Sequence, residues 1–370
     1  MVAMVEDVRQ IESGAASAAL AERLFQSTLA TWDIVTVYLG HRLGIYRALA
    51  AIEPATSLEL AAEAGLAERY VREWLEQQAV AGWLECENSE APAMERRFLL
   101  PPGHAAVLVD IDDANFLAPL AQITVGALHP LQALLTAFRS GDGVPYADYA
   151  QDLRVGQAEM NRNLFLQQLG HDFLPAIPDL HQRLQADPPA RIADIGCGLG
   201  WSCVGMAQAY PNARVDGFDL DAASVAEAQT ILRENGVADR VDVLLRDASD
   251  ADFAGRYDLV TAFECIHDMS DPVGALRTMR RLAGADGTVL VMDERVADTF
   301  DPAAGDVERF MYGFSVLHCL PVGLEEHPSA ATGTVMRTST LRGYAREAGF
   351  SEIEVLPLEH PFFHFYRLIG

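Results

Sequence analysis

The chain has 370 residues, of which 50% are apolar and 22% charged, so it has material for one or two buried cores. Acidic residues outnumber basic ones by 53 to 27, and the formal net charge of −26 repels phosphate backbones and anionic lipids, which argues against nucleic acid as a partner. The sequence contains no lysine, which excludes lysine Schiff-base chemistry and a Walker A phosphate lysine.

The cysteines and the N-terminus indicate the compartment. The five cysteines are scattered and form no CxxC pair, which favours a reducing cytosol over a disulfide scaffold or a thiolate zinc site. The first residues, MVAMVEDVRQIESGAA, lack the features of a signal peptide, and no run of about 18 apolar residues is present. The sequence therefore predicts a cytoplasmic protein with no membrane partner.

Residues 1–110 are expected to form a mainly helical, winged-helix-like domain. An apolar stripe over residues 16–52, broken by Gly40 and Gly44, predicts one or two helices with more apolar surface than one small core needs. Next come a helix capped by Ser57 and ended by Gly65, a second helix over residues 68–80, and a strand after Gly82-Trp83. Two helices joined by a short turn and followed by a β-wing make up the winged-helix arrangement.

This domain could mediate dimerisation or bind DNA. Residues 41–100 hold ten acidic residues and six arginines, and the second helix carries Glu68, Glu73 and Glu76. A helix that reads DNA needs basic residues, so a homodimer through the N-terminal domain is favoured over DNA binding.

The rest of the chain is expected to contain a helical connector over residues 111–185, which contributes to the pocket, and an α/β domain over residues 186–370. Short apolar strands alternate with helical stretches after Arg191, which predicts a Rossmann-like, doubly wound, mostly parallel sheet. Residues 296–335 are an insertion. The last two strands are expected to pack antiparallel at the sheet edge.

A glycine-rich turn follows the first of these strands, in IADIGCGLGWS. Asp194, Gly196, Gly198 and Gly200 lie where the strand turns into a helix, and Asp219 ends the second strand, 19 residues after Gly200. Glycine permits the tight turn and the close approach of a ligand, and the carboxylate is placed to bind ribose hydroxyls. The loop has no basic residue to meet a pyrophosphate.

The GxGxG spacing with a preceding Asp, the following acid and LLRDAS resemble class I S-adenosylmethionine-dependent methyltransferases. This resemblance implies that Asp194 to Gly200 wrap the methionine part of S-adenosylmethionine, and that Asp219, with Leu220 beside it, holds the ribose. Asp247 and Ala248 would meet the adenine, with Phe263 completing the cofactor site. A plain loop cap is the less favoured alternative for Asp247.

The passage ECIHDMSDP follows the fourth strand and ends at the sheet edge where α/β folds bind ligands. A histidine there could take a proton from a substrate, because its ordinary pKa lies near ~6.5. The passage is similar to the HDWSD stretch of plant-type small-molecule O-methyltransferases. That resemblance implies that His267 is the catalytic base, oriented by Asp293 or, with a one-residue slip, by Glu294. It also implies a winged-helix dimerisation domain, and S-adenosylhomocysteine as the product.

Several alternatives remain open at this stage. His267 could be a packed core residue, and Met269 stands where the plant family has tryptophan. No metal is expected, but Glu264, His267 and His318 could form a facial triad for iron in a C-methyltransferase. His318 could instead only line the pocket. A ligand-sensing winged-helix regulator, or a different reaction on the same fold, is also possible.

The methyl acceptor is expected to be a small molecule, with transfer to oxygen favoured over nitrogen or carbon. Aromatic and thioether side chains suit a flat, partly apolar acceptor. The residues predicted to line its pocket are Met160, Phe165, Met311, Phe314, His318 and Phe362.

Overall fold

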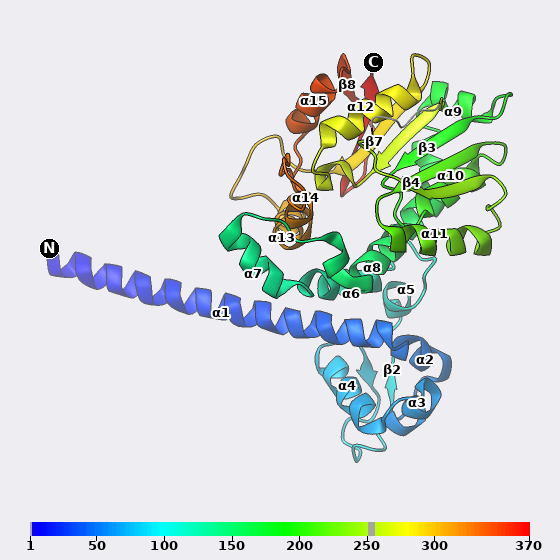
Figure 1. The fold of residues 1–370 in the computed structure, drawn as a ribbon. Helices are drawn as coiled ribbons and strands as arrows, with labels where there is room; N and C mark the ends of the chain where they lie inside the picture. The colour runs from blue at the N-terminus through cyan, green and yellow to red at the C-terminus, as the bar shows by residue number, and fades with distance from the viewer. Residues whose placement is uncertain (1, 251–255) are drawn as a thin grey trace. The chain divides into compact units, whose positions relative to one another are not determined.

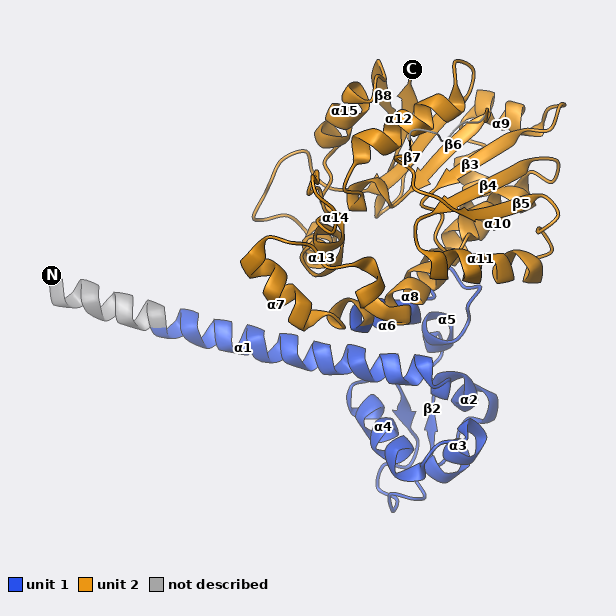
Figure 2. Cartoon of the chain, viewed as in Figure 1, with its two compact units in different colours: residues 1–125 blue, residues 126–370 orange. Residues whose placement is uncertain are grey.

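The computed structural model describes residues 2–250 and 256–370, with side chains from residue 14 onward. It divides into unit 1, residues 1–125, and unit 2, residues 126–370 (Figures 1 and 2). The division differs from the one expected, because residues 111–125 belong to unit 1 and residues 126–185 to unit 2. None of the described helices is both long enough and apolar enough to cross a membrane.

Unit 1 is mainly helical with one small antiparallel sheet. Its elements are α1 (Val2–Arg42), α2 (Ile45–Ile52), α3 (Ser57–Ala64), α4 (Glu68–Val80), β1 (Glu85–Cys86), β2 (Phe98–Leu99), α5 (His104–Leu108) and the start of α6 (Ala118–Leu128). The pair β1–β2 follows α4 as the predicted wing. Tyr46, Leu49, Leu60, Leu75 and Phe98 are at most 1% exposed and form the centre of one core.

The first helix does not break at Gly40, contrary to expectation. It runs on to Arg42, and the turn lies at Gly44, whose φ is 68°. A Cβ atom on Gly40 would lie 2.5 Å from ring atoms of both Trp74 and Tyr46. Gly40 is therefore explained by close packing inside the helix, and Gly44 by its left-handed backbone.

The cap of α3 also differs from the prediction by one residue. Thr56, not Ser57, is the N-cap: its hydroxyl accepts from the backbone N–H of Glu59, and Glu59 Oε2 accepts from the Thr56 N–H at 2.8 Å. This is a capping box, which satisfies two helix-end donors.

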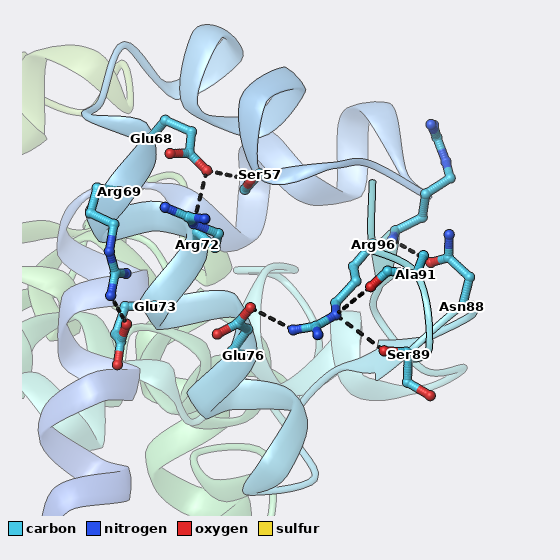
Figure 3. A network of polar contacts seen from close by, with 11 residues as sticks. Ser57, Glu68, Arg69, Arg72, Glu73, Glu76, Asn88, Ser89, Ala91 and Arg96 are labelled. Carbon is cyan, nitrogen blue, oxygen red and sulfur yellow. Dashed lines mark hydrogen bonds and ion pairs between the residues drawn. The ribbon is translucent and has the colours of Figure 1, made fainter. Parts of the chain in front are cut away.

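A network of ion pairs covers α4 and the wing (Figure 3). On α4, Arg69 pairs with Glu73 and Arg72 with Glu68. Arg96, beside the wing, donates to Glu76 at 2.7 Å and to two backbone carbonyls. The three glutamates noted in the sequence are thus each paired with an arginine. The arginines of this face are neutralised within the unit.

Unit 2 is built on one seven-stranded sheet. The strand order is β5-β4-β3-β6-β7-β9-β8; the first five strands are parallel, and β9 is antiparallel to both of its neighbours. The strands are β3 (Arg191–Ile195), β4 (Arg214–Asp219), β5 (Val241–Leu245), β6 (Leu259–Phe263), β7 (Thr288–Glu294), β8 (Glu352–Val355) and β9 (Phe363–Ile369). The predicted mostly parallel sheet with antiparallel edge strands is confirmed.

Helices cover both faces of this sheet (Figure 1). Neighbouring residues of one strand enter different cores, as with Ile192 and Ala193, because side chains alternate across a sheet. The helices are α7 (Leu131–Ser140), η1 (Tyr146–Tyr149), α8 (Ala150–Asn163), η2 (Leu164–Phe173), α9 (Pro178–Gln185), α10 (Trp201–Ala209), α11 (Ala222–Glu234), η3 (Ile266–Asp268), α12 (Pro272–Ala283), α13 (Asp306–Phe314), η4 (Ser315–Cys319), α14 (Leu320–Gly323) and α15 (Thr338–Glu347). The predicted insertion, residues 296–335, contains α13, η4 and α14.

Candidate functional site

A cleft of about 480 Å³ lies at the carboxyl ends of the parallel strands of unit 2. This volume suits a small-molecule ligand. The central strand β3 lies between β4 and β6. After β3 the chain adds β4 and β5 on one side of it and then crosses to β6 on the other side, so the cleft lies where the strand order reverses. Residues that follow β3, β4, β5 and β6 line one wall, and residues of α8 line another.

The glycine loop after β3 has the backbone that the sequence predicts. Gly196, Gly198 and Gly200 all have positive φ, at 67°, 52° and 79°. A Cβ on Gly198 would have no atom within 4 Å, so the loop leaves open space at a position that lines the cleft. A Cβ on Gly196 would lie 2.7 Å from Cys265 Sγ, which shows how closely the loop meets the segment after β6.

Asp219 lies at the end of β4 beside this loop. Its Oδ2 accepts from the Gly198 N–H at 2.7 Å and its Oδ1 from the Asp221 N–H at 2.9 Å. Burial raises the pKa of Asp219, and the backbone donors oppose this shift. A carboxylate at this place can accept from ligand hydroxyls in the cleft, as the sequence predicts for the ribose.

Asp194 lines the cleft, but its carboxylate is already occupied. Oδ1 accepts from the Thr261 hydroxyl at 2.6 Å, and Oδ2 accepts from the Ser202 hydroxyl and from Cys203 Sγ. Burial raises the pKa of Asp194 to about 6, although these donors lower it. The residue therefore ties β3 to β6 and α10, and it supports the loop from behind.

The remaining residues predicted to bind the cofactor also line the cleft: Leu220, Asp247, Ala248 and Phe263. Asp247 Oδ1 accepts from the N–H and the hydroxyl of Ser249 at 2.7 and 2.8 Å. Asp247 therefore caps its own loop, as the alternative interpretation proposed, and it also lines the cleft after β5.

His267 lies in η3, directly after β6, surrounded by carboxylates. Its Nδ1 lies 2.9 Å from Asp293 Oδ1 and 3.1 Å from Glu294 Oε2, and its Nε2 lies 3.2 Å from Asp268 Oδ1. His267 is 2% exposed, and Asp268 lines the cleft next to it. The structure thus brings His267 together with both acids between which the sequence could not choose.

These acids determine the protonation of His267. Burial alone would lower the pKa of His267, but the negative charges of Asp293, Glu294 and Asp268 outweigh it and raise the pKa well above its ordinary value. Burial raises the pKa of Glu294 well above its ordinary value; the charge of His267 opposes this shift and that of Asp293 adds to it. The cluster therefore holds protons strongly.

The alternative metal triad is not assembled. Among the residues that the structure describes, two sets of three ligand atoms lie within 4.8 Å of one another, and both contain His267: one with Asp268 and Cys319, the other with Asp293 and Glu294. Neither set includes Glu264 or His318. His318 is fully buried against Tyr149, at 4.7 Å between ring centres, and burial lowers its pKa to about 4.

The predicted acceptor pocket is brought together only in part. Phe165 lines the cleft, and its ring centre lies 5.6 Å from that of Phe263. The other five predicted residues do not line the cleft formed by the described residues. Met311 and His318 are buried in packing of the inserted segment, Phe314 stacks between Phe310 and His318, and Phe362 is 42% exposed before β9. The fifth, Met160, is partly buried on α8.

Sequence reasoning missed a wall of the cleft that comes from η1, α8 and the segment after α14. Its polar members are Tyr146, Arg154, Gln157, Asn161, Glu325 and Glu326. They carry no motif, because helical spacing alone does not distinguish a cleft-facing side from a solvent-facing side.

The chain matches two family models. Residues 33–110 match the Rv2258c-like winged HTH domain, and residues 187–329 match a methyltransferase domain. The ubiquinone biosynthesis O-methyltransferase of Ralstonia nicotianae is 29% identical over 191 residues, which cover 51% of this chain and 75% of that protein.

Two solved structures share the fold over nearly the whole chain. The mitomycin 7-O-methyltransferase MmcR has a TM-score of 0.69 at 19% identity, covering 96% of this chain and 99% of that one. Human N-acetylserotonin methyltransferase, solved with S-adenosylmethionine, has a TM-score of 0.70 at 16% identity and covers 95% and 98%.

Other curated relatives match one part of the chain. The match covers only 5% of the polyketide synthase ThaQ of Burkholderia thailandensis, at 30% identity, and 36% of the ajmaline N-methyltransferase of Rauvolfia serpentina, at 29%. The chain therefore combines a stretch that matches a winged HTH domain with a later stretch that matches a methyltransferase domain.

Proposed function

We propose that the chain transfers a methyl group from S-adenosylmethionine to a hydroxyl group of a small molecule, with His267 as general base. The observation that carries this proposal is the cleft itself. The glycine loop, Asp219 and Asp268 line it, and Asp268 Oδ1 lies 3.2 Å from Nε2 of the buried His267, whose Nδ1 lies 2.9 Å from Asp293 Oδ1. The O-methyltransferase from Ralstonia nicotianae, which matches half of the chain, supports transfer to oxygen.

The residues present fit the methyl donor. The open space at Gly198 can admit a ligand against the backbone, Asp219 and Asp247 can accept from its nucleoside, and Phe263 adds an apolar wall. When bound, S-adenosylmethionine supplies an electrophilic methyl group for the acceptor oxygen and leaves as S-adenosylhomocysteine. The contribution of the chain is to align the two reactants and to exclude water.

His267 takes the proton that the acceptor oxygen loses. Its Nδ1 is held by Asp293 and Glu294, which fixes the ring and leaves Nε2 as the atom that gains the proton. Nε2 lies 3.2 Å from Asp268, a residue of the cleft wall. Because the acids raise the pKa of His267, the neutral base is present only at pH above that raised value.

The charge of the cleft restricts the acceptor. Nine carboxyl side chains line it, against two arginines. Both arginines are engaged: Arg154 with Glu227 at 2.8 Å, and Arg246 with Asp250 at 3.3 Å. An anionic acceptor would be repelled in this field, so the proposed acceptor is neutral or cationic.

The winged-helix domain is proposed to pair with a second copy of the chain rather than with DNA. On α1, Leu20, Leu24, Phe25, Leu29 and Trp32 are 40–68% exposed and recur at helical spacing, so they form one apolar stripe. The same helix in a second copy is an apolar partner of matching length. DNA binding is not favoured, because the arginines of α4 and the wing are paired with glutamates (Figure 3).

Three phenols that differ in charge test the proposal: tyramine, 4-ethylphenol and 3-(4-hydroxyphenyl)propanoate, each incubated with methyl-labelled donor. Labelled ether is expected from the cationic and neutral phenols and not from the anionic one. With the best phenol, His267→Gln is expected to lower kcat by at least about 100-fold, with S-adenosylhomocysteine affinity within a few-fold of wild type. His129→Gln, at an exposed histidine of unit 2, is the control. Full turnover by His267→Gln would refute its role as base.

A further inference from the structure

Glu264 is a half-buried acid that the proposed reaction does not use. It follows β6 directly and lines the cleft, and its backbone N–H donates to the Met292 carbonyl at 2.8 Å. Its φ is 53°, in the left-handed region, which side chains other than glycine adopt at a cost. Such strained residues cluster at functional sites.

The carboxyl group of Glu264 is incompletely satisfied. Oε1 is buried and has no hydrogen-bond partner, whereas Asn161 on α8 hydrogen-bonds to the group. A buried acceptor without a partner is unfavourable, and Glu264 lines the cleft, so a bound ligand can supply the donor that the chain does not.

The charges around Glu264 are mostly negative. Burial raises its pKa to about 7; His267 on the following 3₁₀-helix lowers the pKa, and Asp293 on β7 and Asp268 raise it. The group is therefore balanced between its acid and carboxylate forms near neutral pH. A cation bound against Oε1 would favour the carboxylate.

The other acids close to the glycine loop are already occupied. Asp194 accepts from Ser202 and Thr261, Asp219 accepts from the loop backbone, and Asp268 faces His267. Glu264 Oε1 and Asp268 Oδ1 are both buried without a hydrogen bond, but Asp268 Oδ1 lies 3.2 Å from His267 Nε2 in an ion pair. Glu264 Oε1 is therefore the carboxyl oxygen near the loop that is left to accept from a ligand.

The strand order fixes which part of the methyl donor reaches Glu264. Asp219 and Asp247 follow β4 and β5, on one side of β3, and these are the positions for the nucleoside. The cleft continues past the β3 loop to the residues after β6, on the other side of β3, so the methionyl part of the donor would extend towards Glu264. Cys265, next to Glu264, would touch a Cβ on Gly196, so this segment borders the loop directly.

We infer that Glu264 is the counter-ion of the α-ammonium group of the methyl donor. This inference rests on the donor site of the proposed function. The α-ammonium is present in both S-adenosylmethionine and S-adenosylhomocysteine, so Glu264 contributes affinity for both and does not discriminate between donor and product. Below neutral pH, binding must remove the proton that Glu264 carries.

The test is a cycle of two ligands and two proteins, measured by isothermal titration calorimetry. The ligands are S-adenosylhomocysteine and its analogue that lacks only the α-amino group; the proteins are wild type and Glu264→Gln. Wild type is expected to bind S-adenosylhomocysteine at least about tenfold more tightly than the deaminated analogue. In Glu264→Gln this difference in affinity is expected to be less than about twofold. The matched control is Glu234→Gln, which removes an exposed acid at the end of α11, outside the cleft lining, and is expected to keep the wild-type preference.

A second readout uses the wild-type protein alone. About one pH unit below 7, binding of S-adenosylhomocysteine is expected to release a proton, seen as a dependence of the heat on buffer ionisation enthalpy. The release disappears about one unit above 7, and the deaminated analogue releases none. Equal ligand preference in wild type and Glu264→Gln, or loss of preference in Glu234→Gln, would overturn the inference and leave the proposed function standing. Failure of wild type to bind S-adenosylhomocysteine at all would overturn both.

Discussion

Replacement of Gly205 by alanine should strain the wall of the cleft. Gly205 lies in α10, and a Cβ there would be 2.1 Å from the Phe165 carbonyl oxygen and 2.8 Å from its carbonyl carbon. Because Cβ contacts below 3.0 Å essentially do not occur, α10 and η2 must separate by about 1 Å. The separation would displace the backbone of Phe165, whose ring packs against Phe263 in the cleft.

The magnitude follows from two opposing terms. Overpacking of this kind costs about 1–3 kcal/mol, and the better helix propensity of alanine returns up to about 1 kcal/mol. The net loss of about 1–2 kcal/mol corresponds to a fall in Tm of roughly 2–8 °C for a unit of this size. Thermal unfolding followed by circular dichroism measures it.

The matched control is Gly343→Ala. Gly343 lies inside α15, and a Cβ there would have no atom within 4 Å, so the same change should leave the Tm equal or slightly higher. If Gly205→Ala melts at or above the wild-type temperature, the close backbone packing of α10 on η2 is not what the structure describes.

Three further outcomes follow from the site and from α1. Asp293→Asn should lower the pKa of His267 towards its ordinary value, because a neighbouring negative charge is removed. Carbon-13 NMR of labelled histidine measures this pKa, and an unchanged value would contradict the proposed effect of Asp293 on His267. In a turnover assay, the wild-type rate should rise as the pH passes the raised pKa of His267, and Asp293→Asn should reach its maximal rate at a lower pH. Gly198→Ala should weaken S-adenosylhomocysteine binding by at least about tenfold, since the added methyl group projects into the cleft. Gly141 also has a left-handed backbone but lies outside the cleft lining, so Gly141→Ala measures the effect of backbone strain alone. Leu24→Glu should shift a dimer to monomer in analytical ultracentrifugation, and a monomeric wild type would refute pairing through α1.

Much of the fold could be predicted from local sequence patterns. The strands of a parallel sheet are buried on both faces, so β3 and β6 read as short apolar runs before a turn. The bounds of α4 match the prediction because its start and end signals are local. The course of α1 through Gly40 could not be predicted, since it depends on Trp74 and Tyr46, which approach from other helices.

The candidate site divides in the same way. The glycine loop, Asp219 and the His267 passage each follow a strand end, and parallel strands bring these ends to one edge. The wall formed by Asn161, Gln157 and Glu325 comes from segments far apart in the sequence and has no motif of its own. Aromatic and thioether composition predicted an acceptor pocket that lay partly in the insertion, but His318 there packs against Tyr149 of η1 and against Phe314.

The claim on which the account depends is that the cleft binds the methyl donor. The most direct measurement is calorimetric titration of S-adenosylhomocysteine into wild type and into Asp219→Ala. We expect one saturable site per chain in wild type, with a Kd of roughly micromolar order, and at least about 100-fold weaker binding in the variant. Absence of binding to wild type at millimolar concentration, or equal binding by Asp219→Ala, would contradict the account.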